Sequence, residues 1–141
     1  MKELKAVVEM VSLGCVASGC DYMNVGITAE ENISILMHDD MGETVERIER
    51  QLTAEQTASF TDKITQLLLS MYQNTGVMGN MVERVVHDEE NDVDLRIGHD
   101  VEMQEVLIEL NGTGVILVLE QIEKIMDLIQ KDRVKGNIYF N

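Results

Sequence analysis

Residues 105–140, EVLIELNGTGVILVLEQIEKIMDLIQKDRVKGNIYF, indicate the fold class most directly. Residues 102–110 predict a strand whose buried face carries Val106, Ile108 and Leu110. After a glycine-rich turn, residues 115–130 are too long and unbroken for a strand, and their polar residues are spaced as in a helix. Residues 137–140 predict a last strand. A strand, a helix and a second strand in this order form a βαβ unit, whose two strands lie parallel.

Similar periodicities upstream predict the remaining elements. Thr53 and Gln56 match a capping box, so a helix is expected to start near Ala54. Its buried stripe is expected to consist of Phe60, Ile64, Leu67, Leu68 and Met71. An earlier helix is expected from Glu43, with Val45, Ile48 and Leu52 on one face. Strands are predicted over residues 33–37, 82–86 and 92–98, the last with Val93, Leu95 and Ile97 inward. Residues 4–11 fit a strand or a helix, and their valine pair favours a strand.

These elements predict a single α/β or α+β domain over residues 1–141. It would have a mixed β-sheet, two or three packed helices and the C-terminal βαβ unit. The chain is long enough to bury one core, and 45% of its residues are hydrophobic. No internal repeat or linker is evident in the sequence. Ten methionines and few aromatic residues indicate a core filled by aliphatic side chains and methionine.

The strongest feature of the composition is an excess of acidic residues. Asp and Glu number 26 against 11 Lys and Arg, which gives a net charge of −15. Between Glu83 and Glu109 the chain holds ten acidic residues and two arginines, a local net charge of −8. Such a field repels nucleic acid and anionic membranes and attracts basic protein surfaces. We therefore expect a basic protein partner, no nucleic-acid binding and no membrane association.

Cys15 and Cys20 are the only cysteines. The segment around them resembles the cleavage region of a lipoprotein signal, but Glu3 and Glu9 interrupt the basic start and the apolar run that such a signal needs. No stretch reaches the ~18 apolar residues of a membrane helix. We therefore expect a cytoplasmic protein in which both thiols are reduced.

All three histidines are followed directly by aspartate. A neighbouring carboxylate can orient an imidazole, and His with Asp is a common ligand set for Zn²⁺, Mn²⁺ or Fe²⁺. A small metal-dependent hydrolase is therefore an alternative function, with the candidate ligands His38, His87, His99, Asp88 and Asp100. Against it, the pairs fall at predicted strand ends, where turn-forming residues collect. They also lack the fixed spacing of His-Glu-x-x-His.

Three other motifs are incomplete. The two cysteines lack the second pair of close ligands that a zinc site needs. The acid-rich segment 88–94 lacks the glycine and the final glutamate of an EF-hand loop. Gly112 and Gly114 are followed neither by the third glycine of a dinucleotide motif nor by the lysine of a phosphate loop. No cofactor is expected.

The segment from Glu105 to Phe140 has the sequence Asn111-Gly112-Thr113-Gly114 between its first strand and its helix. It resembles the closing strand–glycine–helix–strand of some small bacterial toxin-immunity proteins, over under a third of the chain. The resemblance implies a small acidic cytosolic protein that blocks a toxin. It carries no functional residue over to this sequence.

These observations predict a non-enzymatic acidic inhibitor that occupies a basic functional surface of a protein partner. The partner could be a toxin bound by its immunity protein, or a bacterial defence protein bound by a phage-encoded inhibitor. The expected contact residues are Asp88, Glu89, Glu90, Asp92, Asp94, Asp100 and Glu102. The alternatives are the metal-dependent hydrolase and a chaperone that binds an unfolded apolar segment of a secreted effector. Val-rich strands could also pair between copies, which leaves a homo-oligomer open.

Overall fold

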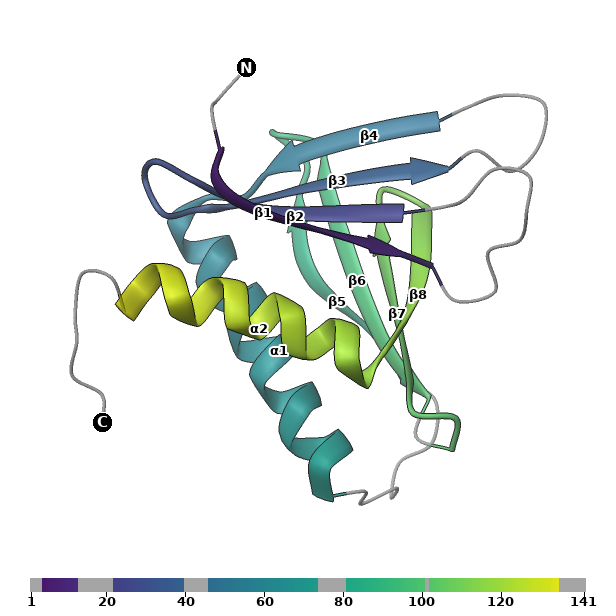
Figure 1. Ribbon diagram of the computed structural model, residues 1–141. Coiled ribbons are helices and arrows are strands. Elements are labelled where there is room, and N and C mark those ends of the chain that lie inside the picture. Colours follow the sequence, from purple (N-terminus) through teal and green to yellow (C-terminus); the bar gives the residue numbers. More distant parts are fainter. Residues whose placement is uncertain (1–3, 13–21, 40–45, 74–80, 101, 135–141) are drawn as a thin grey trace.

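The computed structural model describes residues 4–12, 22–39, 46–73, 81–100 and 102–134. In this part of the chain, four strands and a helix are followed by four more strands and a second helix (Figure 1). The bounds are β1 Leu4–Val11, β2 Tyr22–Thr28, β3 Ile33–Asp39, β4 Glu46–Gln51, α1 Ala54–Gln73, β5 Met81–Asp88, β6 Val93–Asp100, β7 Glu105–Leu110, β8 Thr113–Val118 and α2 Leu119–Val134.

The strands form two four-stranded sheets, in the orders β1-β2-β3-β4 and β5-β6-β7-β8. Each strand pairs antiparallel with its neighbour in the chain. The α+β form of the predicted fold, with two packed helices, is therefore confirmed. The pairings between the described strands are antiparallel rather than mixed, because tight turns join β5 to β6, β6 to β7 and β7 to β8, and such turns cannot join parallel strands.

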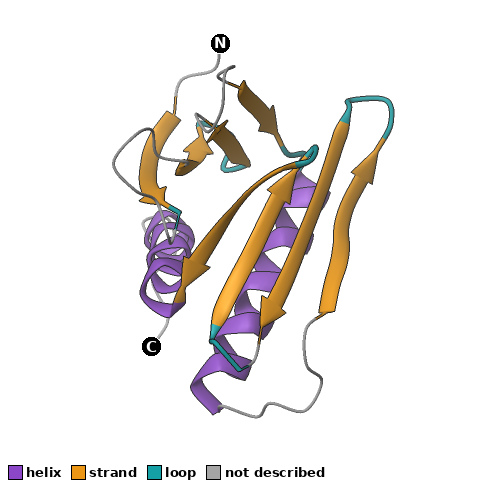
Figure 2. Ribbon diagram, turned by 90° about the vertical axis from the view of Figure 1, so that its right-hand side faces the viewer, coloured by secondary structure: helices purple, strands orange, loops and turns teal. Residues whose placement is uncertain are grey.

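Each helix lies across the sheet of the other half of the chain. Helix α1, which follows the first sheet, packs against β5, and Figure 2 shows it behind the sheet β5–β8. Helix α2, which follows the second sheet, packs against β1 and β2. Lys63 of α1 forms an ion pair with Glu83 of β5. Tyr72 of α1 donates a hydrogen bond of 2.5 Å to Glu123 of α2, so the helices also contact each other.

The two halves repeat one ββββα architecture, which the sequence did not indicate. The buried positions of α1 (57, 60, 61 and 64) recur in α2 at 122, 125, 126 and 129, each 65 residues later. The strand pairings extend this correspondence from the helices to the strands. Followed strand by strand in each sheet, they make Gly98 of β6 the counterpart of Gly26 of β2. Their pairing partners, Val7 in β1 and Val82 in β5, are then equivalent as well.

The starts of the two helices share one side-chain hydrogen bond. The Thr53 hydroxyl accepts a hydrogen bond of 3.1 Å from the Gln56 backbone N–H, and the Gln56 side-chain oxygen accepts one of 3.0 Å from the Thr53 N–H. This is the capping box predicted for a helix near Ala54. At the start of α2, the Gln121 side-chain oxygen accepts the corresponding hydrogen bond, of 2.9 Å, from the Val118 N–H.

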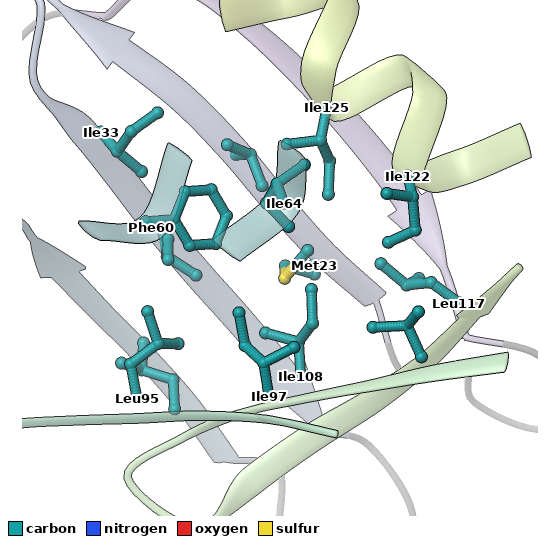
Figure 3. Packing of buried hydrophobic residues seen from close by; sticks show 14 of the residues in the cluster. Met23, Ile33, Phe60, Ile64, Leu95, Ile97, Ile108, Leu117, Ile122 and Ile125 are labelled. Atoms are coloured by element: carbon teal, nitrogen blue, oxygen red, sulfur yellow. The ribbon is translucent and has the colours of Figure 1, made fainter. Parts of the chain in front are cut away.

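One hydrophobic core joins both sheets and both helices (Figure 3). The inward residues predicted for β6 and β7 and the predicted stripe of α1 are all buried. Phe60 and Ile64 of α1 lie between Ile33 of the first sheet and Ile97 of the second. Because each sheet contributes one face to this shared core, the opposite face of each sheet is turned away from it.

Two element predictions in the first half differ from the structure. The helix expected from Glu43 is wrong, since residues 46–51 form strand β4, paired with β3. Ile48 and Leu52 are four residues apart, which fits both a helical and an alternating period, and pairing with β3 selects the alternating one. Strand β2 was not expected, because most of it lies within the glycine-rich stretch from Gly14 to Gly26, and such stretches are typical of loops.

The C-terminal unit begins as predicted with a strand and a helix, but the helix starts at Leu119 instead of Val115. Asn111 and Gly112 have φ of 51° and 89°, which is the geometry of a two-residue hairpin turn. The chain therefore reverses into β8, which pairs antiparallel with β7 before α2 begins. The last strand predicted over residues 137–140 lies outside the described residues.

Candidate acidic interface

The seven predicted contact residues lie in two groups. Four of them belong to the turn between β5 and β6, which we call the acidic turn (residues 88–92), and Asp94 follows it on β6. Asp100 and Glu102 lie at the other end of β6. Asp94 and Asp100 are six residues apart on this extended strand, about 20 Å at ~3.4 Å per residue, and the acidic turn lies farther from Asp100 still. The structure therefore does not bring the seven acids into one patch.

The carboxylate of Asp88 organises the acidic turn. It accepts hydrogen bonds from the backbone N–H and the side-chain amide of Asn91, at 3.0 and 2.8 Å. It also accepts one of 2.8 Å from the side-chain amide of Gln56, in the first turn of α1. These donors, first of all the Asn91 side chain, hold the pKa of Asp88 below its ordinary value. Asp88 is therefore charged at neutral pH and fixed in place.

Arg50 holds the other end of the acidic turn to the first sheet. Its Nε donates to the backbone oxygen of Asp92 at 2.7 Å, and its second terminal nitrogen donates to the Asp92 carboxylate at 2.9 Å. Asn111 donates a further hydrogen bond of 2.9 Å to the same backbone oxygen. Asp92 has a φ of 57°, a conformation that Asp adopts more readily than most residues. The acidic turn is thus fixed by residues from β4, α1 and the β7–β8 turn.

Besides Asp88 and Asp92, two more of the predicted residues lie close to side chains of the same chain. Asp94 lies 3.3 Å from Arg84 and 3.5 Å from Arg96, so its charge is offset on the sheet surface. The Glu89 carboxylate lies 3.5 Å from the imidazole of His87. Glu90 is exposed and has no ion pair within the described residues. Glu90 is therefore the best placed to meet a cation, since Arg50 already pairs with the exposed carboxylate of Asp92.

Two further acids, Glu49 and Glu55, belong to the same region and were not predicted. Glu49 lines a groove of about 520 Å³ between the end of β4, the start of α1 and the acidic turn, together with Asn91 and Val93. Glu55 lies in the first turn of α1, next to Gln56. Both are more than 30 residues from the acidic turn in the sequence, so only the tertiary structure brings them to it.

The second group of acids lies beside an apolar hollow on the outer face of the second sheet. Asp100 and Glu105 are paired across β6 and β7, and both line this hollow of about 220 Å³. Its remaining lining consists of Val82, Gly98, His99, Leu107 and Ile116. Asp100 accepts a hydrogen bond of 3.1 Å from the backbone N–H of Met103. Glu102 is exposed in the same turn.

The His-Asp pairs do lie at strand ends, as the sequence suggested, but the structure keeps them apart. His87 and His99 are at opposite ends of the β5–β6 hairpin, opposite Asp94 and Met81 respectively. His38 belongs to the other sheet and stacks on Tyr22, with ring centroids 4.6 Å apart. Nowhere in the described ranges do three His, Cys, Asp or Glu side chains lie close enough to hold a metal ion. Cys15 and Cys20 lie outside those ranges.

No family model, curated protein or solved structure matches this chain. No helix in the described residues is both long and apolar enough to cross a membrane. The function is therefore best inferred from the charge and geometry of the acidic turn and its surroundings.

Proposed function

We propose that the protein is a non-enzymatic inhibitor that occupies a basic functional surface of another protein, with the acidic turn at the centre of the contact. A toxin or a nucleic-acid-binding defence protein would present such a surface. The observation that carries the proposal is the rigid presentation of Asp88, Glu89, Glu90 and Asp92, which Arg50, Gln56 and Asn91 hold from neighbouring elements.

Fixed carboxylates favour binding for two reasons. A turn that is already ordered loses little conformational freedom when a partner docks, so more of the interaction free energy appears as affinity. A cluster of like charges also speeds the encounter with an oppositely charged surface, and this effect weakens as salt screens the field. A surface that normally binds the phosphates of nucleic acid would meet a similar charge on the acidic turn.

The proposal is tested by affinity capture from the host at about 50 mM and about 500 mM salt, followed by measurement of the association rate with the captured protein. The test variant changes Glu89, Glu90 and Asp92 to Lys. The control variant changes three exposed acids elsewhere, Glu9, Asp62 and Asp127, to Lys and alters the net charge by the same amount.

We expect the turn variant to lose at least tenfold in association rate, and the control variant to lose much less, because the local field guides the encounter. Equal rates for the two variants would contradict the assignment of the acidic turn. Capture that does not weaken with salt would instead favour the chaperone for an apolar segment.

A further inference from the structure

The outer face of the second sheet carries a row of apolar residues that crosses all four strands. Val82 pairs with Gly98, Gly98 with Leu107, and Leu107 with Ile116. Gly98 follows the buried Ile97, so this row lies on the face turned away from the core, toward the viewer in Figure 2. Val82 is 55% exposed and Ile116 is 38% exposed. The missing side chain at Gly98 leaves the hollow of about 220 Å³ between them.

The first half of the chain shows what fits above a glycine at this position. Gly26 is the counterpart of Gly98, and a Cβ atom at residue 26 would lie 2.6 Å from Cδ1 of Leu4. A leucine of the same chain therefore covers Gly26. The hollow at Gly98 has the same apolar character, and it has room for a side chain of this kind.

Charge defines one border of the hollow. The next cross-strand row contains Asp100 and Glu105, which line the hollow and have no cationic partner within the described residues. On the opposite border, Arg84 and Arg96 already share the carboxylate of Asp94. An occupant with an apolar side chain beside a positive charge would satisfy both the hollow and its acidic border.

We propose that the hollow at Gly98 binds an aliphatic side chain of a partner protein, with a Lys or Arg next to it that meets Asp100 and Glu105. This inference rests on the proposed function, and it adds a second contact to the acidic turn, at the other end of β6. The second contact would select among basic surfaces, because the charge of the acidic turn does not distinguish one basic protein from another, whereas a hollow of fixed shape does.

The inference is tested by NMR titration of the whole ¹⁵N-labelled protein with three blocked tripeptides, KLK, KSK and ELE. We expect KLK to shift the amide signals of Gly98, Leu107 and Ile116 and to bind about tenfold more tightly than KSK. Burying one leucine side chain accounts for a factor of this size. ELE should bind more weakly than KLK, because its carboxylates would face Asp100 and Glu105.

The structural repeat supplies a matched control. Val82→Asp places a charge in the apolar row and should abolish the shifts caused by KLK. Val7→Asp makes the same change at the equivalent, 53% exposed position of the first sheet and should leave the shifts intact. Leu107→Thr provides a second test if Val82→Asp disturbs the fold, which the dispersion of the amide signals would reveal.

Equal binding of KLK and KSK, equal binding of KLK and ELE, equal effects of Val82→Asp and Val7→Asp, or shifts centred on other residues would each overturn the inference. Reversing the charges of Glu89, Glu90 and Asp92 should not affect KLK binding, because these acids lie at the far end of β6. If KLK does not bind while that reversal still abolishes partner capture, the inference fails and the proposed function stands. If KLK binds but the reversal leaves capture unchanged, the proposed function fails.

Discussion

At the scale of single residues, Asp88 shows how the acidic turn is kept both charged and ordered. Three donors from two neighbouring segments converge on its carboxylate, so the charged form is favoured in the folded protein. The same residue lies in a run of acids that repel one another. The hydrogen bonds of Asp88 therefore offset the repulsion that concentrating charge in one turn creates.

This arrangement predicts a specific pH dependence for Asp88→Asn. The pKa of Asp88 is lower in the folded than in the unfolded state, so its stabilising contribution is complete above the ordinary Asp pKa of about 3.9. It is lost as the pH falls through the folded pKa. Urea unfolding between about pH 6 and pH 2.5 should show wild type and Asp88→Asn converging toward low pH. Glu90→Gln is the control and should follow wild type at each pH, since Glu90 has no ion pair in the described part of the chain.

The candidate site could be predicted only in part from individual residues. The acid-rich segment between Glu83 and Glu109 includes the acidic turn, because these residues are close in the sequence. It also included Asp94, whose arginine partners depend on strand register. It could not include Glu49, which reaches the acidic turn only through the packing of β4. The order of residues in the sequence thus indicated where acidic residues are concentrated, but not which of their carboxylates lack partners.

At the scale of elements, the turn between β7 and β8 determines the direction of the chain in the C-terminal part. Gly112 has a φ of 89°, and no atom lies within 4 Å of the place where a Cβ would be added. Gly112→Ala should therefore destabilise the fold through backbone strain alone, by about 1 kcal/mol or more in the free energy of unfolding. Urea unfolding measures this effect.

Gly114→Ala provides a contrast for Gly112→Ala. A Cβ at residue 114 would lie 2.8 Å from Cγ of Glu109 and 3.2 Å from the backbone oxygen of Ile108. Its cost should therefore fall when Glu109 is shortened to Ala, whereas the cost of Gly112→Ala should not change. An equal response of both variants to Glu109→Ala would contradict the strain explanation for Gly112.

The elements that were predicted correctly carry their own local signals. Helix α1 has a capping box and a long apolar stripe, and β6 alternates between apolar and charged residues from Val93 to Ile97. Strands β4 and β8 lack such signals. The sequence Val115–Leu119 is apolar throughout, so periodicity does not separate a strand from a buried helix there. The dipeptide Asn111-Gly112 is the signal that separates the two, since this dipeptide between alternating apolar residues is typical of two-residue hairpins and so indicates a strand after it.

At the scale of the whole molecule, each helix packs mainly on the sheet of the other half of the chain. Helix α2 packs on β1 and β2, and α1 packs on β5. We therefore expect residues 1–79 and residues 80–141, produced separately, to give no folded monomer, because each would expose the inner face of its sheet. Mixed at equal concentration, they should form a one-to-one complex with native circular dichroism. A folded monomer from either fragment would contradict this dependence.

The exchange of helices gives the chain the geometry of a domain-swapped homodimer whose two subunits have been joined into one polypeptide. A true homodimer must show every surface feature twice, once on each copy. A single chain is free of that symmetry, so its two halves can carry different residues at equivalent places. Leucine covers one of the two equivalent glycines, and a hollow lies at the other. One face of the molecule can thus be adapted to a partner while its counterpart only supports the fold.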